Sequence, residues 1–489
     1  MMKSFFKKAF LCMQLVMLSV TPAVSEEVDF SGSLETDFGL TLPYTEDAFK
    51  IVNASSTVNS ALNVYGGNSS LKIDGALTFD AVNALYSENS LDYINAESSL
   101  IAFKLNEAYY DYSRNFWGFR IGRQIAQWGA ADSFIVSNII CPQNLTVLSG
   151  TDVSETANGI NAIKLNVNAC WFNADFYWIP IFTPSTLPLK KSSILNELFI
   201  PSSIDLTDYG LSELAVNSFT SEDITLPELA LKNGEYALRL NAYTGFADFS
   251  LYGYYGWEDT PCVSYAVNTA EQTEPYPGYG NVTVNVPESI TLSGEYKRVF
   301  MIAFDSSIPL GQVTLRLEGT FFPYRYFSVS AENQLKQQFE QYEESGSIDP
   351  SGVKTIQQNH NLIALAGADW IKGDWTLSTQ YYADFVFEGG ETEAAGDNSV
   401  DNLERDAFVH KTSFSISYSA LAGSLDLSLN GIIGLNYFDT AIVPQVSYSL
   451  NDSIKLSLSA YIFNAGKEDG TYGLYKDLSC VILKGRFYF

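Results

Sequence analysis

The stretch Ile454-Lys455-Leu456-Ser457-Leu458-Ser459-Ala460-Tyr461-Ile462 alternates apolar residues with polar or small ones along its whole length. A period of two residues is typical of a β-strand whose two faces meet different surroundings. The same alternation recurs at 236–241, 313–318 and 425–430. The pattern therefore predicts an all-β protein built from many two-faced strands.

About 18 strands of this kind follow one another to the end of the chain, and 16 is the second choice. They are expected near residues 28–42, 57–66, 69–81, 101–113, 116–127, 159–168, 170–180, 235–245, 247–257, 294–308, 311–323, 360–371, 374–387, 408–420, 424–436, 439–449, 453–463 and 474–489. Tight turns alternate with long connections, as a transmembrane barrel requires, because its two rims face different compartments. A soluble β-sandwich does not sort its loops by end. We therefore expect one antiparallel transmembrane β-barrel with short periplasmic turns and long outer loops that carry short helices.

Residues 1–25 have the pattern of a secretory signal peptide, and residues 26–489 would then form the barrel. Three lysines precede an apolar core from Ala9 to Val20, and Ala23-Val24-Ser25 fits a small-x-small cleavage site. The core is too short to span a bilayer comfortably, which argues against an uncleaved anchor. The exported chain is expected to be an integral protein of the bacterial outer membrane.

Aromatic residues mark the end of the chain and the ends of the strands. The last segment, Gly485-Arg486-Phe487-Tyr488-Phe489, alternates and ends in an aromatic residue. It resembles the signal by which bacterial barrel-assembly machinery recognises its clients, so Phe489 is the expected assembly residue and that machinery an expected partner. All seven tryptophans fall near inferred strand ends. Because tryptophan is favoured at membrane interfaces, we expect them to form girdles in contact with outer-membrane lipid.

Composition excludes several classes of function. With 28 Lys and Arg against 56 Asp and Glu the net charge is −28, so no basic face is available for nucleic acid. Two histidines and the absence of hydrolase, metalloprotease and phosphate-loop motifs argue against an enzyme, a bound metal and a cofactor. The four cysteines of residues 26–489 have no metal-type spacing; either Cys141 pairs with Cys262, or all four are simple small residues.

Strand parity places several charged residues on the inner wall. If Leu238 and Leu240 face lipid, Arg239 between them faces the lumen. A charge on the lipid face near the midplane would cost roughly 2–4 kcal/mol, so inward placement is expected. The same count turns inward Arg316, Glu318, Lys411, Lys455, Lys484 and Arg486. These residues either line a water-filled lumen in pairs with acids or create a transverse field that selects solutes.

The most distinctive hairpin joins the strands near 101–113 and 116–127. A turn at Arg114-Asn115 would set Tyr109 opposite Arg120, with Glu107 and Asp111 as diagonal neighbours of that arginine. This predicts a cluster of tyrosine, carboxylate and arginine on the inner wall. The alternative is a set of structural pairs that only fixes the strand register.

Arg123 has the parity of the lipid-facing residues Phe119 and Ile121. Either Gly122 marks a bulge that turns Arg123 inward, or Arg123 lies high enough to meet headgroup phosphates. We favour the inward placement, and so count Arg123 among the lumen residues.

The long outer loops carry further signals. Loop 128–158, the third outer loop, is too apolar for a solvated loop, and we expect it to fold into the lumen as a constriction rather than add an outer strand pair; its marker residues are Phe134, Ile139 and Pro142. Loop 181–234 should contain short helices, and 330–345 has helical spacing that favours a helix on the rim over a moving plug. Loops 258–293 and 387–407 are strongly acidic, which either attracts cations to the mouth or serves solubility.

The segments Glu-Ala-Tyr-x-Asp-Tyr at 107–112, Gly-Arg-Gln at 122–124 and Trp-Gly at 128–129 resemble functionally uncharacterised porin-superfamily outer-membrane barrels. These are related at a distance to alginate-export and carbohydrate porins. The resemblance covers roughly 100–260 in motif and the remainder in architecture, and it implies a bacterial outer-membrane channel without naming a substrate. We therefore expect porin-like passive diffusion of small hydrophilic solutes, with an oligomer left open. The alternative is a surface-exposed adhesin or antigen held by an occluded barrel.

Overall fold

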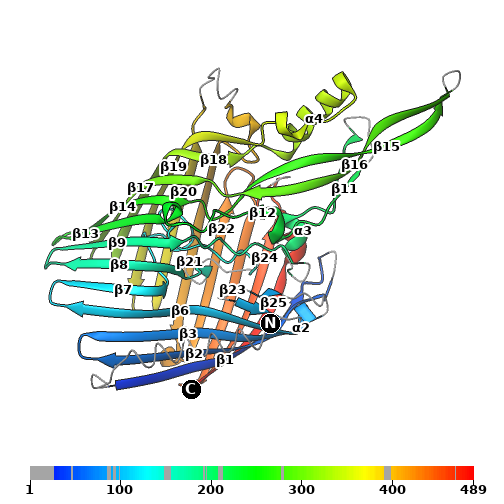
Figure 1. The fold of residues 1–489 in the computed structure, drawn as a ribbon. Coiled ribbons are helices and arrows are strands. Elements are labelled where there is room, and N and C mark those ends of the chain that lie inside the picture. The colour runs from blue at the N-terminus through cyan, green and yellow to red at the C-terminus, as the bar shows by residue number, and fades with distance from the viewer. Residues whose placement is uncertain are drawn as a thin grey trace, which may run out of the picture.

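The computed structural model describes residues 27–45, 48–84, 90–91, 95–97, 100–147, 156–190, 193, 195–207, 213–276, 280–389, 398–467 and 470–489. The predicted signal peptide lies outside these residues. Within them, 18 strands form one closed antiparallel barrel, which confirms the predicted fold and strand count (Figure 1). Pairing of the last strand with the first closes the wall, with Glu35 opposite Arg486.

The barrel strands follow one another around the wall in chain order. They are β1 (Glu27–Thr41), β2 (Ile51–Gly66), β3 (Ser69–Asp80), β6 (Ile101–Arg114), β7 (Trp117–Gln124), β8 (Ile160–Asn168), β9 (Phe172–Ile181), β13 (Glu235–Tyr243), β14 (Asp248–Trp257), β17 (Arg298–Leu310), β18 (Val313–Ser328), β19 (Ile356–Lys372), β20 (Trp375–Val386), β21 (Phe408–Ala420), β22 (Leu425–Gly434), β23 (Thr440–Asn451), β24 (Ile454–Asn464) and β25 (Cys480–Tyr488). Tight turns lie at one rim and the long connections at the other, as the alternation of loop lengths predicts.

The turn between β6 and β7 differs from the predicted one. Asn115 has φ 54°, so Asn115 and Phe116 are the two turn residues and Arg114 pairs with Trp117. Asparagine tolerates the left-handed conformation that the first position of such a hairpin turn requires. The predicted register was therefore wrong by two residues: Arg120 lies directly opposite Asp111, and Tyr109 opposite Gly122.

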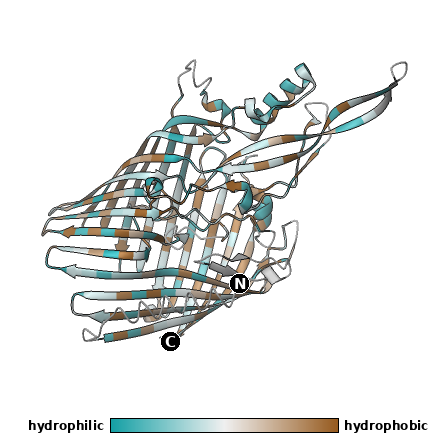
Figure 2. Ribbon diagram, viewed as in Figure 1, coloured by the Kyte–Doolittle hydropathy of each residue, from teal (hydrophilic) through white to brown (hydrophobic). Residues whose placement is uncertain are grey.

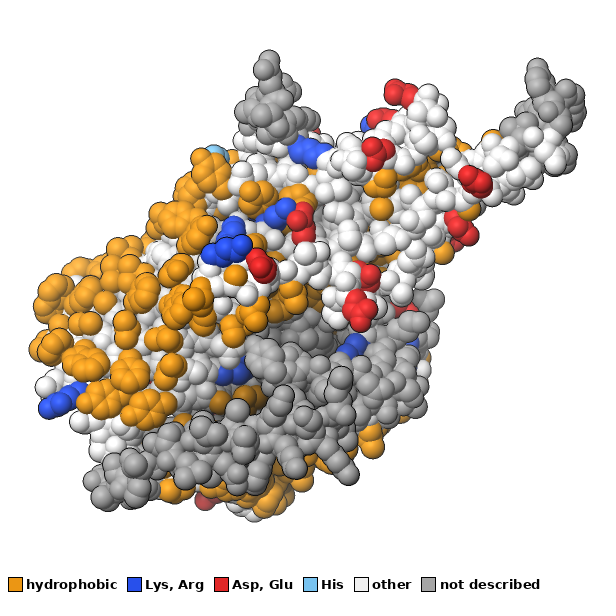
Figure 3. Space-filling model, viewed as in Figure 1, with side chains coloured by type: hydrophobic (Ala, Val, Ile, Leu, Met, Phe, Trp, Pro, Cys, Tyr) orange, Lys and Arg blue, Asp and Glu red, His pale blue; other side chains and the backbone are white. Residues whose placement is uncertain are grey.

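The outer surface of the barrel is apolar. Figure 2 shows brown and teal residues alternating along the strands, and Figure 3 shows hydrophobic side chains covering the end of the barrel near the tight turns. Leu238 is 41% exposed, whereas its neighbour Ala237 is 2% exposed on the inner face. Trp171 is exposed at a tight turn, but Trp128 is buried inside the barrel, so the expected girdle position was wrong for Trp128.

The outer rim carries a second, smaller sheet, formed by residues that the sequence predicts to be loops. The hairpin of β15 (Cys262–Tyr276) and β16 (Gly280–Glu295) projects from the barrel, and three short strands join its inner part, two by pairing with β16 and the third by pairing with one of these two (Figure 1). These are β10 (Ser203–Ile204), β11 (Leu214–Val216) and β12 (Ile224–Thr225). Loop 258–293 is thus a hairpin, because its apolar residues pack into a separate core with the predicted helix, α4 (Ala331–Ser345).

Helix α4 closes the edge of β15. The side-chain amide of Gln334 accepts from Tyr265 N at 2.9 Å and donates to Val263 O at 3.2 Å. Gln338 accepts from Val267 N at 2.8 Å and donates to Tyr265 O at 2.7 Å. Two glutamines one helical turn apart therefore satisfy the edge groups that a neighbouring strand would otherwise bind.

The remaining elements are short. They are α2 (Ala81–Ala84), β4 (Ser90–Leu91), β5 (Asn95–Glu97), α3 (Asn196–Phe199) and the 3₁₀ turns η3 (Ser221–Asp223), η4 (Leu231–Asn233), η5 (Pro350–Gly352), η6 (Val400–Asn402), η7 (Leu421–Gly423) and η8 (Lys476–Leu478). Among the residues described above, no helix has the length and apolarity needed to cross a membrane.

Candidate functional site

The segment 125–147 lies inside the barrel against the inner wall. Its residues Trp128, Phe134, Val136, Ile140 and Cys141 are buried in one core with inward-facing residues of eight strands, namely Ile160, Ala162, Tyr177, Ile179, Ala237, Tyr252, Tyr254, Val299, Met301, Ala303, Phe322, Ile363, Leu365 and Ile432. This core contains no described residue of β1, β2, β3, β23, β24 or β25. The segment therefore covers one part of the inner wall and leaves the rest uncovered.

Aromatic contacts hold two points in the first half of the segment against the wall. The Trp128 ring lies 5.0 Å from the ring of Tyr252, and the Phe134 ring stacks on Tyr382 at 5.0 Å. Of the other predicted constriction residues, Ile139 packs against the same core and Pro142 is buried with its carbonyl bound to Asn158 N at 2.7 Å. The apolar side chains that make this loop unsuitable for solvent are thus in contact with the inner wall.

Glu318 binds the backbone of the segment. One carboxylate oxygen accepts from Ala130 N at 2.7 Å and Ala131 N at 2.9 Å. The other accepts from Ser137 N at 2.8 Å and Ser137 Oγ at 2.5 Å. Glu318 is 3% exposed and pairs with no base among the described residues, which corrects the expectation that it balances an inward cation. The reason is that the segment passes over Glu318, so that its backbone amides and Ser137 bring four hydrogen-bond donors to this one carboxylate.

Arg316 adds ionic contacts to the same segment. Its Nη1 lies 2.8 Å from a carboxylate oxygen of Asp132 and 2.8 Å from Ala130 O, while its Nε lies 2.6 Å from Asp369 on the neighbouring strand. Two predicted lumen residues of β18, Arg316 and Glu318, are therefore engaged in holding the loop. Sequence spacing gave no sign of this, because the partners are more than 180 residues apart.

The predicted hairpin cluster forms in part. Arg120 Nε lies 2.8 Å from Asp111 Oδ2, and the Arg120 guanidinium carbon lies 4.1 Å from the centre of the Tyr109 ring. Glu107 does not join them: it binds Lys72 at 2.5 Å and accepts from Ile125 N at 3.0 Å. The expectation that Glu107 neighbours Arg120 was wrong, because the turn lies one residue further along the chain.

Arg123 is 5% exposed and donates from Nε to Leu105 O at 2.8 Å, so it does not reach lipid headgroups. The pairing of β6 with β7 is continuous, without the expected bulge. Instead Gly122 has φ 128°, a conformation that favours glycine, and Ala108 O lies against the position that a Cβ would occupy there.

The other predicted lumen bases are mostly paired with acids. Lys484 lies 2.8 Å from Glu35, which also pairs with Arg486, and Lys455 lies 3.5 Å from Asp426. Two bases differ. Arg239 donates to Asn241 at 2.9 Å, and the Lys411 amine lies 5.2 Å from the centre of the Tyr472 ring.

Short polar side chains occupy the wall that the segment leaves uncovered. In β24, Leu456 and Leu458 are exposed to lipid, so the intervening Ser457 faces inward. The same parity turns inward Thr57, Asn59 and Ser459, and, beside the covered part of the wall, Ser415, Ser417 and Ser428 of β21 and β22. Hydroxyl and amide groups of this size leave room for water beside them.

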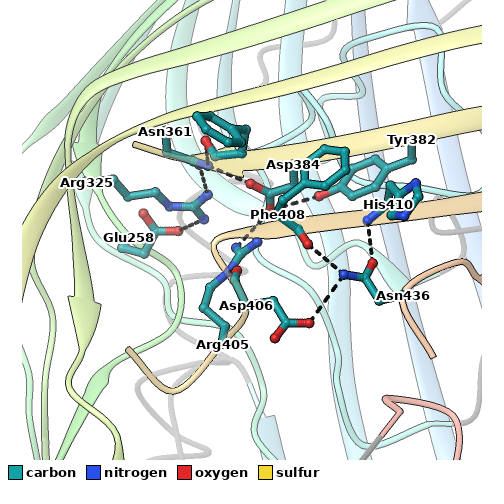
Figure 4. Close-up of polar contacts among 11 residues, drawn as sticks. Glu258, Arg325, Asn361, Tyr382, Asp384, Arg405, Asp406, Phe408, His410 and Asn436 are labelled. Carbon is teal, nitrogen blue, oxygen red and sulfur yellow. Dashed lines mark hydrogen bonds and ion pairs between the residues drawn. The ribbon is translucent and has the colours of Figure 1, made fainter. Parts of the chain in front are cut away.

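A polar network at the outer end of the inner wall was not foreseen from the sequence (Figure 4). Arg325 binds Glu258 at 2.6 Å and Asn361 at 2.8 Å; Asn361 donates to Asp384 at 2.6 Å, and Arg405 binds Asp384 at 2.8 Å. In the sequence, Arg405 stands out only by its position in the acidic loop 387–407. No spacing rule would have joined residues from five separate segments.

The structure also places the residues that bear on enzyme and metal chemistry. His410 stacks on Phe408, a lipid-facing residue that is 40% exposed, and His360 lies against Phe321 and Tyr324. Among the described residues, no group of three metal-ligating side chains occurs. All four cysteines there are free, and Cys141 Sγ accepts from Ala126 N at 3.2 Å.

No protein-family model and no curated protein sequence match the chain. Solved structures with a similar fold include OccAB2 of Acinetobacter baumannii, at 8% identity over 96% of this chain and 99% of that one, with a TM-score of 0.48. OccK8 (OprE) of Pseudomonas aeruginosa has 9% identity over 95% and 98%, with a TM-score of 0.49. The outer membrane channel DcaP of Acinetobacter baumannii has 10% identity over 95% and 97%, with a TM-score of 0.39.

The closed strand order, the apolar outer surface and the sorting of loop lengths define an integral β-barrel of the outer membrane. The strand number is that of the wider barrels, whose lumen exceeds what wall side chains alone can fill.

Proposed function

We propose that the protein is a porin-like channel through which small hydrophilic solutes diffuse passively across the outer membrane. The observation that carries the proposal is the division of the inner wall. The segment 125–147 is bound to the strands on one side, and short hydroxyl and amide side chains line the other. A wall of this kind supports a hydrated path beside the segment, which would then set the width of the channel.

The charge pattern supports a path for solutes of either sign rather than one dominated by bases. Lys72, Arg120 and Lys484 each have a carboxylate within 2.8 Å. Ion pairs of this kind present local dipoles to a passing solute instead of an uncompensated field. We propose that the inward residues Tyr109, Asp111, Arg239, Arg316, Lys411, Lys455 and Arg486 complete the lining, together with Glu107 and the buried Arg123 and Glu318 behind it.

Single-channel conductance tests this proposal. The refolded protein, shown to be folded by its heat-modifiable migration in gels, is added to a planar lipid bilayer under a salt gradient. Stepwise conductance is expected, and the reversal potential reports the preferred ion. A folded barrel that never conducts would contradict the channel.

One observation favours the alternative function, a surface protein that binds partners. The β15–β16 hairpin extends well beyond the rim, and it has a core of its own with α4 (Figure 1). If the folded barrel did not conduct, we would propose this partner-binding role in place of the channel. In either case we propose Phe489 as the residue recognised by the assembly machinery; its backbone pairs with Gly32 at 2.9 and 3.0 Å.

A further inference from the structure

One arginine, Arg298, lies on the largely apolar lipid-facing surface of the barrel. Arg298 opens β17 at the outer rim and pairs with Trp257 of β14, while its neighbour in parity, Phe300, is 42% exposed to lipid. The guanidinium carbon lies 4.2 Å from the Trp257 ring centre and 5.2 Å from that of Tyr255. Arg298 therefore lies among the aromatic residues that face the membrane interface.

Arg298 forms no direct ion pair with an acid among the described residues. Its Nη1 donates to Gly234 O at 3.0 Å and its Nη2 to Lys232 O at 3.4 Å, so only two carbonyls bind it. Glu228 pairs with Lys232 at 3.1 Å, and Glu295 pairs with Lys297 at 2.7 Å. The buried acid Glu235 lies within electrostatic range of Arg298, but its carboxylate accepts hydrogen bonds from Tyr254 Oη at 2.6 Å and Trp257 N at 2.9 Å instead of pairing with the guanidinium. A guanidinium with spare donors at an interface is well suited to a planar or tetrahedral oxyanion.

The segment above Arg298 exposes leucines. Leu226, Leu229 and Leu231 are 58%, 77% and 71% exposed, and they lie within six residues of one another. Asn233 and Gly234 hold this segment on the barrel: Trp257 Nε1 donates to Asn233 O at 3.0 Å. Three exposed leucines beside an interfacial arginine form an amphipathic surface, which is typical of contact with lipid.

We propose that Arg298 and Lys232, with Trp257, Tyr255 and the leucines of 226–231, bind a lipid of the outer leaflet whose phosphate-bearing headgroup has a net negative charge. Arg298 and the exposed amine of Lys232 contact the phosphate, and the leucines and aromatic rings contact the upper acyl chains. Figure 3 shows basic side chains at the border between the hydrophobic part of the barrel and its polar outer part. The charge complementarity and the adjoining apolar side chains together favour a lipid over a free anion.

Native mass spectrometry of the folded barrel in detergent micelles tests the site. Phosphatidylglycerol and phosphatidylcholine are added separately, and the lipid adducts that remain bound are compared. We expect the wild-type protein to retain phosphatidylglycerol about 25-fold better, because each of the two basic contacts at the interface contributes about fivefold. Arg298→Gln and Lys232→Gln should each reduce this preference about fivefold. Lys232→Gln should do so without disturbing the fold, because that side chain is 73% exposed.

Arg114→Gln is the matched control, since Arg114 is exposed at the tight-turn rim and its replacement removes the same charge. The proposal requires that this variant keep the preference of the wild type. Equal losses in both arginine variants, or no loss in Arg298→Gln, would overturn it. Displacement of the lipid by millimolar inorganic phosphate would also overturn it, because the site would then bind a small anion rather than a lipid.

Discussion

Replacement of Glu318 by glutamine should release the segment 125–147 from the inner wall. Each carboxylate oxygen accepts two hydrogen bonds, one oxygen from Ala130 N and Ala131 N, the other from the amide and hydroxyl of Ser137. An amide has a single acceptor oxygen, so in either orientation of Glu318→Gln two donors face an NH₂ group. Hydrogen bonds to charged groups contribute about 1.5–3 kcal/mol each, so the loss is about 3 kcal/mol or more.

A loss of about 3 kcal/mol shifts the equilibrium between the bound and released segment about 150-fold. In single-channel recordings we expect larger conductance steps or frequent transitions between levels, compared with steady levels in the wild type. Asp426→Asn is the control, because it removes the same inner-wall charge at Lys455 and Ser419, away from the segment. Steady wild-type levels in folded Glu318→Gln would refute the reasoning, as would the same change in Asp426→Asn.

Three further outcomes are expected. Arg120→Ala leaves its carboxylate partner unpaired, so the reversal potential should move toward cation preference if the hairpin cluster lines the path. Gln338→Ala removes two hydrogen bonds to the edge of β15, worth about 1 kcal/mol each, and limited proteolysis should cut the hairpin faster while the barrel stays heat-modifiable. Burial raises the pKa of the Cys262 thiol to about 11, so at pH 8 the thiol stays protonated, and maleimide should label the exposed Cys170 first, as mass spectrometry of labelled peptides would show.

The strands could be predicted because each one is exposed to two solvents. In β24 every second residue faces lipid, so apolar and polar residues alternate in the sequence, as in Leu456, Ser457 and Leu458. The same constraint sorts the loops by length, since only one rim has room for large ones. The parity of Arg239 and its inward placement follow from this constraint too.

Side-chain partners could not be predicted in the same way, because they depend on where separate segments meet. Because Asn115 adopts a left-handed conformation, the register of its hairpin differs from the predicted one. Glu107 consequently pairs with Lys72 and not with Arg120. The hairpin of 262–295 alternates as clearly as the barrel strands, but the excess of acids in this part of the chain suggested a solvated loop. Its apolar face is covered by α4, which lies almost 40 residues further along the chain.

The inner segment also bears on how an acidic chain can have lysines and arginines on the inner wall of its barrel. Arginine and lysine in the lumen are matched by local acids such as Glu35, Asp111 and Asp369, while Glu318 is neutralised by no base but by four hydrogen-bond donors of the segment. If the segment left the wall, Glu318 would face the lumen as an uncompensated charge, and Asp132 would leave Arg316. The position of the segment therefore determines both the width of the proposed path and the balance of charge along it.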